Sequence, residues 1–260
     1  MKPILFQIFG WPVHSYGLML AIAFLVGIIG LGRVAPKRLG VQFDHIVDLA
    51  MWILIGAVVG SRVAYVITEY QLYLRAPWEV FNLASGGLAF HGGLIGGFLA
   101  GFWFLKRKKI YPWTLADQIA PFIALGYAIV RIGCLLNGCC YGKPTTVAWA
   151  LRCAAADFTL RHPTQLYSMV GSLILFFILW RLRNHRQFPG FLFLLYVGLY
   201  SILRFIVEIF RVGPMVFPWL SLAQVVCLAM AVVAFGLIWL IHRRYQRGRL
   251  GSDAGTEING

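Results

Sequence analysis

The sequence predicts an all-α, polytopic integral membrane protein with seven transmembrane helices, and three observations support this prediction. The 260 residues are 60% hydrophobic and 12% charged, with a mean hydropathy of +0.77, whereas soluble domains carry about 25% charged residues. Seven apolar segments are long enough to cross a bilayer, which takes about 20 residues. Most Lys and Arg residues lie in every second connection between these segments. Water-soluble classes are therefore excluded, and cationic cytoplasmic loops explain the net charge of +14 better than nucleic-acid binding does.

The seven expected spans follow one another along a single domain. They cover residues 15–33, 46–67, 87–105, 115–134, 166–182, 190–210 and 219–241. The first apolar run has no small-x-small cleavage site before Arg33, so we expect a retained helix rather than a signal peptide. The third segment is rich in glycine, which lets helices approach closely in lipid. We expect one seven-helix domain over residues 1–245 and a flexible cytoplasmic tail over residues 246–260, which is polar and glycine-rich.

The distribution of positive charge predicts the orientation of the chain. Four connections hold most of the cationic residues: Arg33, Lys37 and Arg38; Lys106 to Lys109; Arg181, Arg183 and Arg186; Arg243, Arg244, Arg247 and Arg249. Loops of this kind stay in the cytoplasm. We therefore expect the N-terminus outside the membrane and the C-terminus in the cytoplasm.

Arg131 lies at the end of an apolar run, residues 118–130, that carries no formal charge. A guanidinium cannot lose its proton at relevant pH, and a charge inside a membrane span costs several kcal/mol, so an anionic partner inside the helix bundle is one explanation. The alternative is an arginine at a helix end that reaches the interface.

A second polar group lies in the sixth expected span. Tyr200, Arg204 and Glu208 are spaced four residues apart, which places them on one helix face, and Arg211 follows. One interpretation is an Arg204–Glu208 ion pair that lowers the cost of placing both charges in a membrane-spanning helix. The other is an anion site in which Glu208 orients Arg204. Arg131 supports this second interpretation, because two arginines and one carboxylate leave an excess positive charge that a phosphate would neutralise.

His91 is the ionisable residue inside the glycine-rich third segment, beside Gly92 and Gly93. It could be a hydrogen-bonded structural residue. Alternatively, the two glycines clear space for a ligand, and a neutral histidine near buried arginines could act as a general base, since like charge disfavours its protonation.

Three cysteines, Cys134, Cys139 and Cys140, lie near the start of the longest connection, residues 135–165. Their C-x4-C-C spacing is not a usual zinc pattern, and His162 is the histidine of the same loop. We therefore expect no metal site and no cofactor. A disulfide from Cys139 or Cys140 to Cys153 is an alternative in an oxidising compartment.

Short motifs in a fixed order resemble those of the prolipoprotein diacylglyceryl transferase family. They are Tyr16-Gly17-Leu18-Met19, His91-Gly92-Gly93, Arg131-x-Gly133 with Asn137-Gly138 and Gly142, His162-Pro163-x-Gln165-Leu166-Tyr167, and Tyr200-x3-Arg204-x3-Glu208-x2-Arg211. The resemblance extends from about Tyr16 to Gln224. It implies a seven-helix, multi-pass enzyme of the bacterial inner membrane, with a periplasmic N-terminus and a cytoplasmic C-terminus.

The resemblance also implies a reaction and a set of site residues. The family transfers the diacylglyceryl group of phosphatidylglycerol to the lipobox cysteine thiol of a preprolipoprotein signal peptide, and releases glycerol 1-phosphate. By this resemblance the implied catalytic residues are His91, Arg131 and Arg204, and the implied substrate-binding residues are Tyr16, Asn137, Tyr200 and the same two arginines. The implied supporting residues are Gly92, Gly93, Glu208, Arg211 and Gln165. The implied partners are these two substrates and membrane lipid, without nucleic acid.

The central signature departs from the family's common form, Gly-Arg-x-Gly-Asn-Phe-x-Asn-Gly-Glu. Val130 precedes Arg131, Cys134 replaces the first Asn, and Cys139 replaces the Glu, as in a diverged branch with a cysteine-containing signature. Three alternatives stay open: a related lipid-dependent transferase with a changed acceptor, a lipid-binding scaffold, and an organic-anion transporter. A transporter would predict internal repeats, and the sequence shows none.

Overall fold

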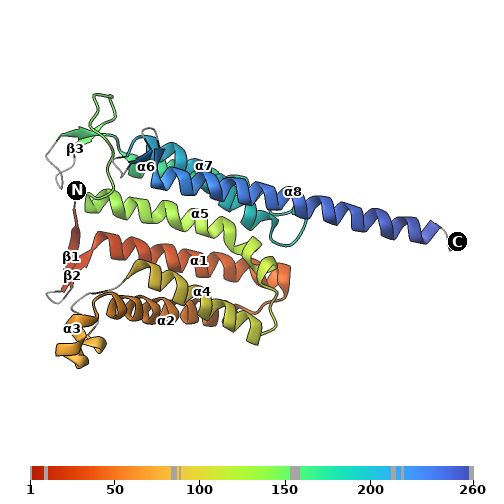
Figure 1. Ribbon diagram of the computed structural model, residues 1–260, viewed down its shortest axis with the longest axis horizontal. Coiled ribbons are helices and arrows are strands. Elements are labelled where there is room, and N and C mark those ends of the chain that lie inside the picture. The colour runs from red at the N-terminus through yellow and green to blue at the C-terminus, as the bar shows by residue number, and fades with distance from the viewer. Residues whose placement is uncertain are drawn as a thin grey trace. The chain divides into compact units, whose positions relative to one another are not determined.

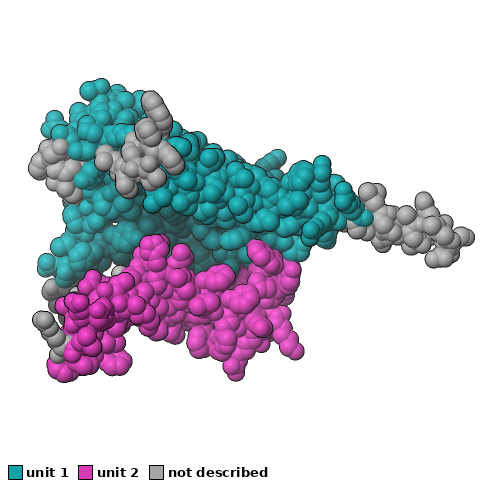
Figure 2. Space-filling view, in the orientation of Figure 1, with its two compact units in different colours: residues 1–30, 116–260 teal, residues 31–115 magenta. Residues whose placement is uncertain are grey.

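The computed structural model describes residues 2–8, 11–82, 87, 89–152, 159–211, 215–217 and 220–257. The chain divides into two compact units (Figure 2). Unit 1 comprises Met1–Gly30 and Ala116–Gly260, and unit 2 comprises Leu31–Leu115. Cys153 and Trp219 lie outside the described residues, and with Cys153 the disulfide alternative that involves it.

Helices make up most of the described chain (Figure 1). The long helices are α1 (Ser15–Leu39), α2 (Phe43–Thr68), α4 (Phe90–Arg107), α5 (Pro112–Asn137), α6 (Thr164–Leu182), α7 (Phe191–Ile209) and α8 (Leu222–Glu257). Two short helices, α3 (Tyr70–Arg75) and η1 (Pro77–Phe81), follow α2. Three antiparallel two-stranded ribbons pair β1 (Ile4–Ile8) with β2 (Trp11–His14), β3 (Leu151–Arg152) with β4 (Leu160–Arg161), and β5 (Met215–Phe217) with β6 (Leu220–Ser221).

Six helices of the described residues are long and apolar enough to cross a membrane. They are α1, α2, α5, α6, α7 and the Leu222–Arg247 part of α8. Only 17% to 39% of each candidate span is buried within the protein, so most of its apolar surface faces outward, as it does in a helix surrounded by lipid. The prediction of a helical, polytopic membrane protein is confirmed.

The helix at the third predicted span, α4, is not among these six. It contains several glycines, His91, and a last turn with Lys106 and Arg107. A seventh span at α4 therefore stays a prediction, as does the orientation of the termini. α8 runs to Glu257 and so includes much of the predicted tail, residues 246–260; the flexibility of that tail also stays a prediction.

In unit 2, α2 and α4 pack backbone against backbone. Each helix carries two glycines four residues apart, Gly56 and Gly60 on α2 and Gly92 and Gly96 on α4. A Cβ atom added at Gly92 would meet the Gly60 carbonyl oxygen, and one added at Gly96 would meet that of Gly56. The expected close approach of the glycine-rich segment is confirmed, and small residues at this spacing are typical of membrane helix pairs.

Arg62 on α2 holds the segment that follows the helix in unit 2. Its side chain is 6% exposed and donates hydrogen bonds to backbone carbonyls of η1 and its surroundings: Glu79, Val80 (2.8 Å), Asn82 (2.9 Å) and Gly87 (3.0 Å). The guanidinium carbon lies 5.4 Å from the centre of the Tyr73 ring. A cation in an apolar helix is thus satisfied by carbonyl oxygens and aromatic faces.

In unit 1, a carboxylate on α5 fixes the start of α7. Asp117 is fully buried; its Oδ2 accepts a hydrogen bond from the backbone N–H of Gly190 (2.9 Å) and its Oδ1 from that of Phe193 (3.1 Å). The first N–H groups of a helix have no partner within the helix, and a negative charge there is favourable. Asp117 therefore joins α5 to the N-terminus of the helix that carries Arg204.

Candidate active site

Arg131 lies in the last two turns of α5, partly buried beside Tyr127, one turn earlier on the same helix. Its guanidinium donates a hydrogen bond to the Tyr127 hydroxyl, and its central carbon lies 4.5 Å from the centre of that ring. The Nε atom is buried and has no hydrogen-bond partner among the described residues. A buried, unpartnered N–H on a charged group is costly, so this atom is available to an anion.

Arg204 and Glu208 in the C-terminal half of α7 form ion pairs with each other and, through Glu208, with Arg211 just beyond the end of the helix. Arg204 Nη2 lies 2.8 Å from Glu208 Oε2, and Arg211 Nε lies 3.7 Å from the same oxygen. Glu208 is only 7% exposed. The predicted pairing of Arg204 with Glu208 is confirmed. Arg204 Nη1 is nevertheless buried without a hydrogen-bond partner among the described residues, so Glu208 leaves part of this guanidinium unused.

Tyrosines connect the arginine of α5 to those of α7. The Tyr127 ring of α5 meets the Tyr200 ring of α7 edge to face, with centroids 5.2 Å apart. Tyr200 in turn stacks on Tyr196 and interacts electrostatically with Arg204, one turn along α7. Tyr127 was not singled out in the sequence, although its position four residues before Arg131 is the spacing of neighbours on a helix face.

The connection after α5 returns to the end of α7. Gly142 forms a β-bridge with Arg211, and the Lys143 N–H donates to the Phe210 carbonyl (2.8 Å). A Cβ atom at Gly142 would collide with that same carbonyl, which explains glycine at this position. The loop that begins at the end of the Arg131 helix is therefore tied to the Arg211 end of α7.

The N-terminus of α6 holds the cysteine-containing part of this loop. Thr164 donates through Oγ1 to the Cys140 carbonyl, and Gln165 donates through Nε2 to the Cys139 carbonyl, both at 2.6 Å. Pro163 occupies the cap position of α6, where no side-chain cap forms, and the Thr164 hydroxyl binds the loop instead. Gln165 is 2% exposed and holds the loop through its hydrogen bond to the Cys139 carbonyl.

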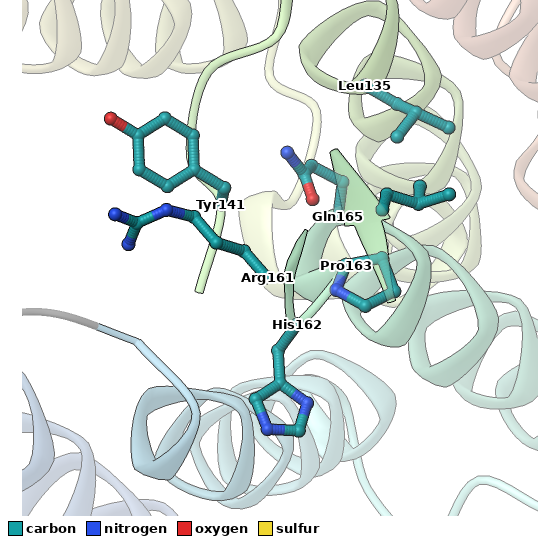
Figure 3. Close-up of a pocket in the computed structure, with 7 residues that line it drawn as sticks. Leu135, Tyr141, Arg161, His162, Pro163 and Gln165 are labelled. Carbon is teal, nitrogen blue, oxygen red and sulfur yellow. The ribbon is translucent and has the colours of Figure 1, made fainter. Parts of the chain in front are cut away.

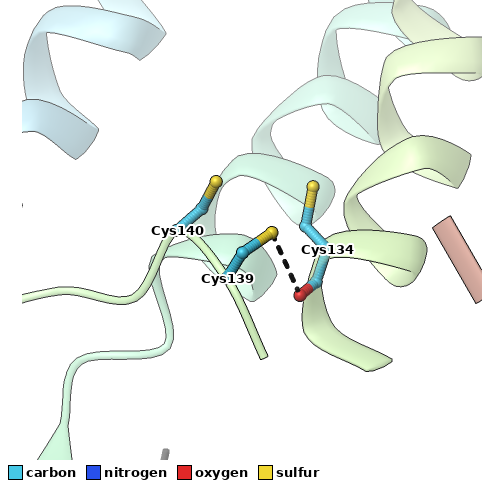
Figure 4. A group of neighbouring side chains, drawn as sticks. All are labelled: Cys134, Cys139 and Cys140. Atoms are coloured by element: carbon cyan, nitrogen blue, oxygen red, sulfur yellow. Dashed lines mark hydrogen bonds between the residues drawn. The ribbon is translucent and has the colours of Figure 1, made fainter. Parts of the chain in front are cut away.

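Three sulfur atoms meet at the start of the loop (Figure 4). The Sγ atoms of Cys134, Cys139 and Cys140 all lie within 4.8 Å of one another. A hydrogen bond from the Cys134 thiol lowers the pKa of Cys140 to about 4, against the opposing effect of partial burial. The charges of Arg211 and Arg131 act in the same direction as the thiol. The pKa of the Cys140 thiol is thus lowered beside Arg131 of α5 and Arg211, which follows α7.

Tyr16 and Asn137 lie near the same end of α5. Tyr16, the second residue of α1, interacts electrostatically with Arg131 and with the three cysteines. Its backbone packs against Gly133, where an added Cβ atom would lie 3.1 Å from the Tyr16 Cα. Asn137 is the last residue of α5 and is half-buried. The structure therefore brings Tyr16, Tyr200 and the arginines into one region of unit 1.

His91 lies in unit 2, in the first turn of α4 rather than in the middle of a span. Its side chain is exposed, and its ring meets that of Phe90 edge to face at 5.6 Å. Gly92 and Gly93 face α2, where an added Cβ atom at Gly93 would lie 3.2 Å from the Ala57 carbonyl oxygen. The two glycines thus seat the helix that presents His91.

A small pocket lies beside the loop, and residues of β3 and β4 contribute to its lining (Figure 3). Its lining residues are Leu135, Tyr141, Leu151, Arg161, His162, Pro163 and Gln165. Arg161 lies over the Tyr141 ring at 5.1 Å and donates to the Gly142 carbonyl (3.3 Å). The His162 ring contacts the Tyr167 hydroxyl at 3.1 Å. The pocket touches the His162–Tyr167 motif but not Arg131 or Arg204.

A family model and several known proteins match most of this chain. The family model described as prolipoprotein diacylglyceryl transferase matches residues 3–240. A phosphatidylglycerol–prolipoprotein diacylglyceryl transferase of Pseudomonas fluorescens is 35% identical over 260 aligned residues, with 94% of this chain and 95% of the relative covered. Relatives of the same name from Trichormus variabilis (93% and 90% covered) and Clostridium tetani (82% and 87% covered) are also 35% identical.

Proposed function

This chain belongs to the prolipoprotein diacylglyceryl transferase family, and we propose that it transfers the diacylglyceryl group of phosphatidylglycerol to the lipobox cysteine thiol of preprolipoproteins, with release of glycerol 1-phosphate. It is a lipid-dependent transferase of lipoprotein biogenesis. The acyl chains stay in the bilayer while the headgroup reaches the polar side chains of unit 1.

The observation that carries the proposal is a pair of partly buried, incompletely paired arginines. Arg131 Nε on α5 and Arg204 Nη1 on α7 have no hydrogen-bond partner among the described residues, and Tyr127 and Tyr200 link the two helices between them. A phosphate offers several acceptor oxygens that match the fork of a guanidinium. The headgroup phosphate is the ligand that satisfies both atoms.

The net positive charge of the arginines and Glu208 stabilises the leaving group more than the substrate. Arg131, Arg204 and Arg211 stand against one carboxylate, Glu208, in this group of described residues. The headgroup phosphodiester is a monoanion, whereas the glycerol phosphate that leaves becomes a monoester with a charge of about −2 at neutral pH. Negative charge builds up on the phosphate as the C–O bond breaks, so the excess positive charge stabilises the transition state more than the bound substrate. This difference lowers the activation barrier.

The chemical step is a displacement at the glycerol carbon. The thiolate sulfur of the acceptor forms a bond to that carbon while the bond from the carbon to the phosphate oxygen breaks, and the bonding electrons leave on that oxygen. We assign the thiol proton to His91, which is exposed at the start of α4. A thiol with a pKa near 8.5 needs only a modest base.

The other predicted residues have positioning roles in this proposal. Tyr16, Asn137 and Tyr200 orient the headgroup, and Glu208 and Arg211 support Arg204. Gln165 supports the loop, whereas Gly92 and Gly93 support the helix of His91. We place the enzyme in the bacterial inner membrane with seven spans, α4 included, a periplasmic N-terminus and a cytoplasmic C-terminus, on the distribution of Lys and Arg.

The test is complementation of a bacterium that lacks this transferase activity, followed by mass spectrometry of a lipobox peptide. The unchanged protein should restore growth and yield a peptide with a diacylglyceryl thioether. His91→Gln should be inserted in the membrane but should not yield the thioether. A lipid that is consumed with release of glycerol phosphate while the peptide stays unmodified would indicate a different acceptor; headgroup binding without any transfer would indicate a scaffold.

A further inference from the structure

The cysteine cluster of unit 1 has the composition of a metal site that its sequence spacing does not predict. Cys134 comes from the end of α5, and Cys139 and Cys140 come from the loop after it. The chain reverses here with a positive φ angle on each side of Cys139, +75° at Gly138 and +64° at Cys140. The turn brings Cys139 and Cys140 back over Cys134, which a C-x4-C-C spacing on a continuous helix could not do.

The turn is held in this form by groups outside the cluster. A residue other than glycine with a positive φ costs about 1–3 kcal/mol and persists only where its surroundings fix it. Here the buried side chains of Thr164 and Gln165 bind the carbonyls of Cys140 and Cys139, and the Cys139 N–H donates to the Cys134 carbonyl at 3.2 Å. Metal ligands are commonly oriented by such outer hydrogen bonds.

We propose that Cys134, Cys139 and Cys140 bind a zinc ion through their three sulfur atoms, with a fourth position open to solvent or ligand. Zinc–sulfur bonds of about 2.3 Å place tetrahedral sulfur ligands about 3.8 Å apart. The three Sγ atoms lie within 4.8 Å of one another, so their separations exceed the tetrahedral spacing by at most about 1 Å. Figure 4 shows the three sulfurs turned toward a common space.

The charges around the cluster suit a thiolate site. Cysteines lose their protons when they bind zinc, so three thiolates and one Zn²⁺ carry a net negative charge. Arg131 and Arg211 both interact electrostatically with Cys140, and they offset this charge. Soft thiolate ligands select zinc over Mg²⁺ or Ca²⁺, which prefer oxygen.

The experiment uses the full-length protein purified in detergent under reducing conditions, with Co²⁺ as the spectroscopic probe. The unchanged protein should bind one Co²⁺ per chain with an intense thiolate-to-metal absorption band, and Zn²⁺ should abolish the band. Cys134→Ser and Cys140→Ser should each lose the band. Cys227→Ala is the matched control, since Cys227 is a free, buried cysteine on α8 outside the cluster, and it should keep the band.

Three results would overturn the proposal. One is a folded, reduced protein that shows no cobalt–thiolate band. Another is a Cys140→Ser protein that keeps the full band. The third is zinc content, measured by elemental analysis, that does not differ between Cys134→Ser and the unchanged protein. Each variant is checked by circular dichroism and gel filtration, so that lost binding is not confused with lost folding.

Discussion

At the scale of single residues, the proposed function depends on guanidinium groups whose hydrogen-bond donors the protein itself only partly satisfies. Arg131 has Tyr127 as its partner, and Arg204 has Glu208, yet each keeps one buried nitrogen without a hydrogen bond among the described residues. A lysine could restore the charge but not the fork of donors that contacts two phosphate oxygens at once. The identity of these side chains, and not their charge alone, should therefore matter.

Replacement of Arg204 by Lys tests this distinction. Arg204→Lys keeps the cation beside Glu208 but removes the forked contact, so transfer should fall by about 10-fold or more, as expected for a lost charge-assisted hydrogen bond of about 1.5–3 kcal/mol. The measurement is the initial rate of thioether formation with purified enzyme. A rate equal to that of the unchanged protein would show that a point charge suffices.

Glu208 should act through Arg204 and Arg211 rather than on the substrate. Glu208→Gln removes the carboxylate that orients both arginines, and the rate should fall about 10- to 100-fold. Glu69→Gln, at an exposed position after α2, is the matched control. A loss confined to Glu208 supports the orienting role, whereas an equal loss in both variants would count against it.

At the scale of elements, the helices are positioned by contacts that sequence patterns reveal to different degrees. The glycines of α2 and α4 recur every four residues, so a close helix pair was predictable from the chain. The cap of α7 was not, because Asp117 lies on α5, 73 residues before Gly190 in the chain. The β-ribbons are equally hidden, since their strands are only two to five residues long and depend on pairing rather than on a periodic pattern.

The glycine contact between α2 and α4 predicts a position-specific loss of stability. Gly96→Val puts a branched side chain against the Gly56 carbonyl, so the helices must separate, and the thermal midpoint of unfolding in detergent should fall by several degrees. Gly236→Ala on α8 is the control, because an added Cβ atom there meets nothing within 4 Å. Its midpoint should stay the same or rise, since alanine favours helix.

The cap of α7 predicts a second loss of stability. Asp117→Ala leaves the N–H groups of Gly190 and Phe193 without their acceptor, and unfolding should become easier by about 2 kcal/mol. Chemical unfolding in detergent, followed by tryptophan fluorescence, measures the change. An Asp117→Ala protein as stable as the unchanged protein would show that these two hydrogen bonds do not position α7.

At the scale of the whole molecule, the sequence predicted the class and most of the helices, and the structure supplied the relations between them. Hydropathy placed the long helices to within several residues except at the end of α8, which runs to Glu257, 16 residues beyond the predicted span. α1 continues to Leu39 through Lys37 and Arg38, because cations at a helix C-terminus are favourable rather than terminating. The cap by Asp117 and the meeting of three sulfurs depend on how the chain folds back, which no local spacing encodes.

The most direct test of the central claim compares the two arginines in purified enzyme. Thioether formation on a lipobox peptide is measured against phosphatidylglycerol concentration for Arg131→Ala, Arg204→Ala and the control Arg243→Ala, whose side chain lies over Trp239 on α8. The account predicts that each of the first two loses about 100-fold or more in kcat/KM while the control keeps its rate. Full activity of correctly folded Arg131→Ala or Arg204→Ala would contradict it.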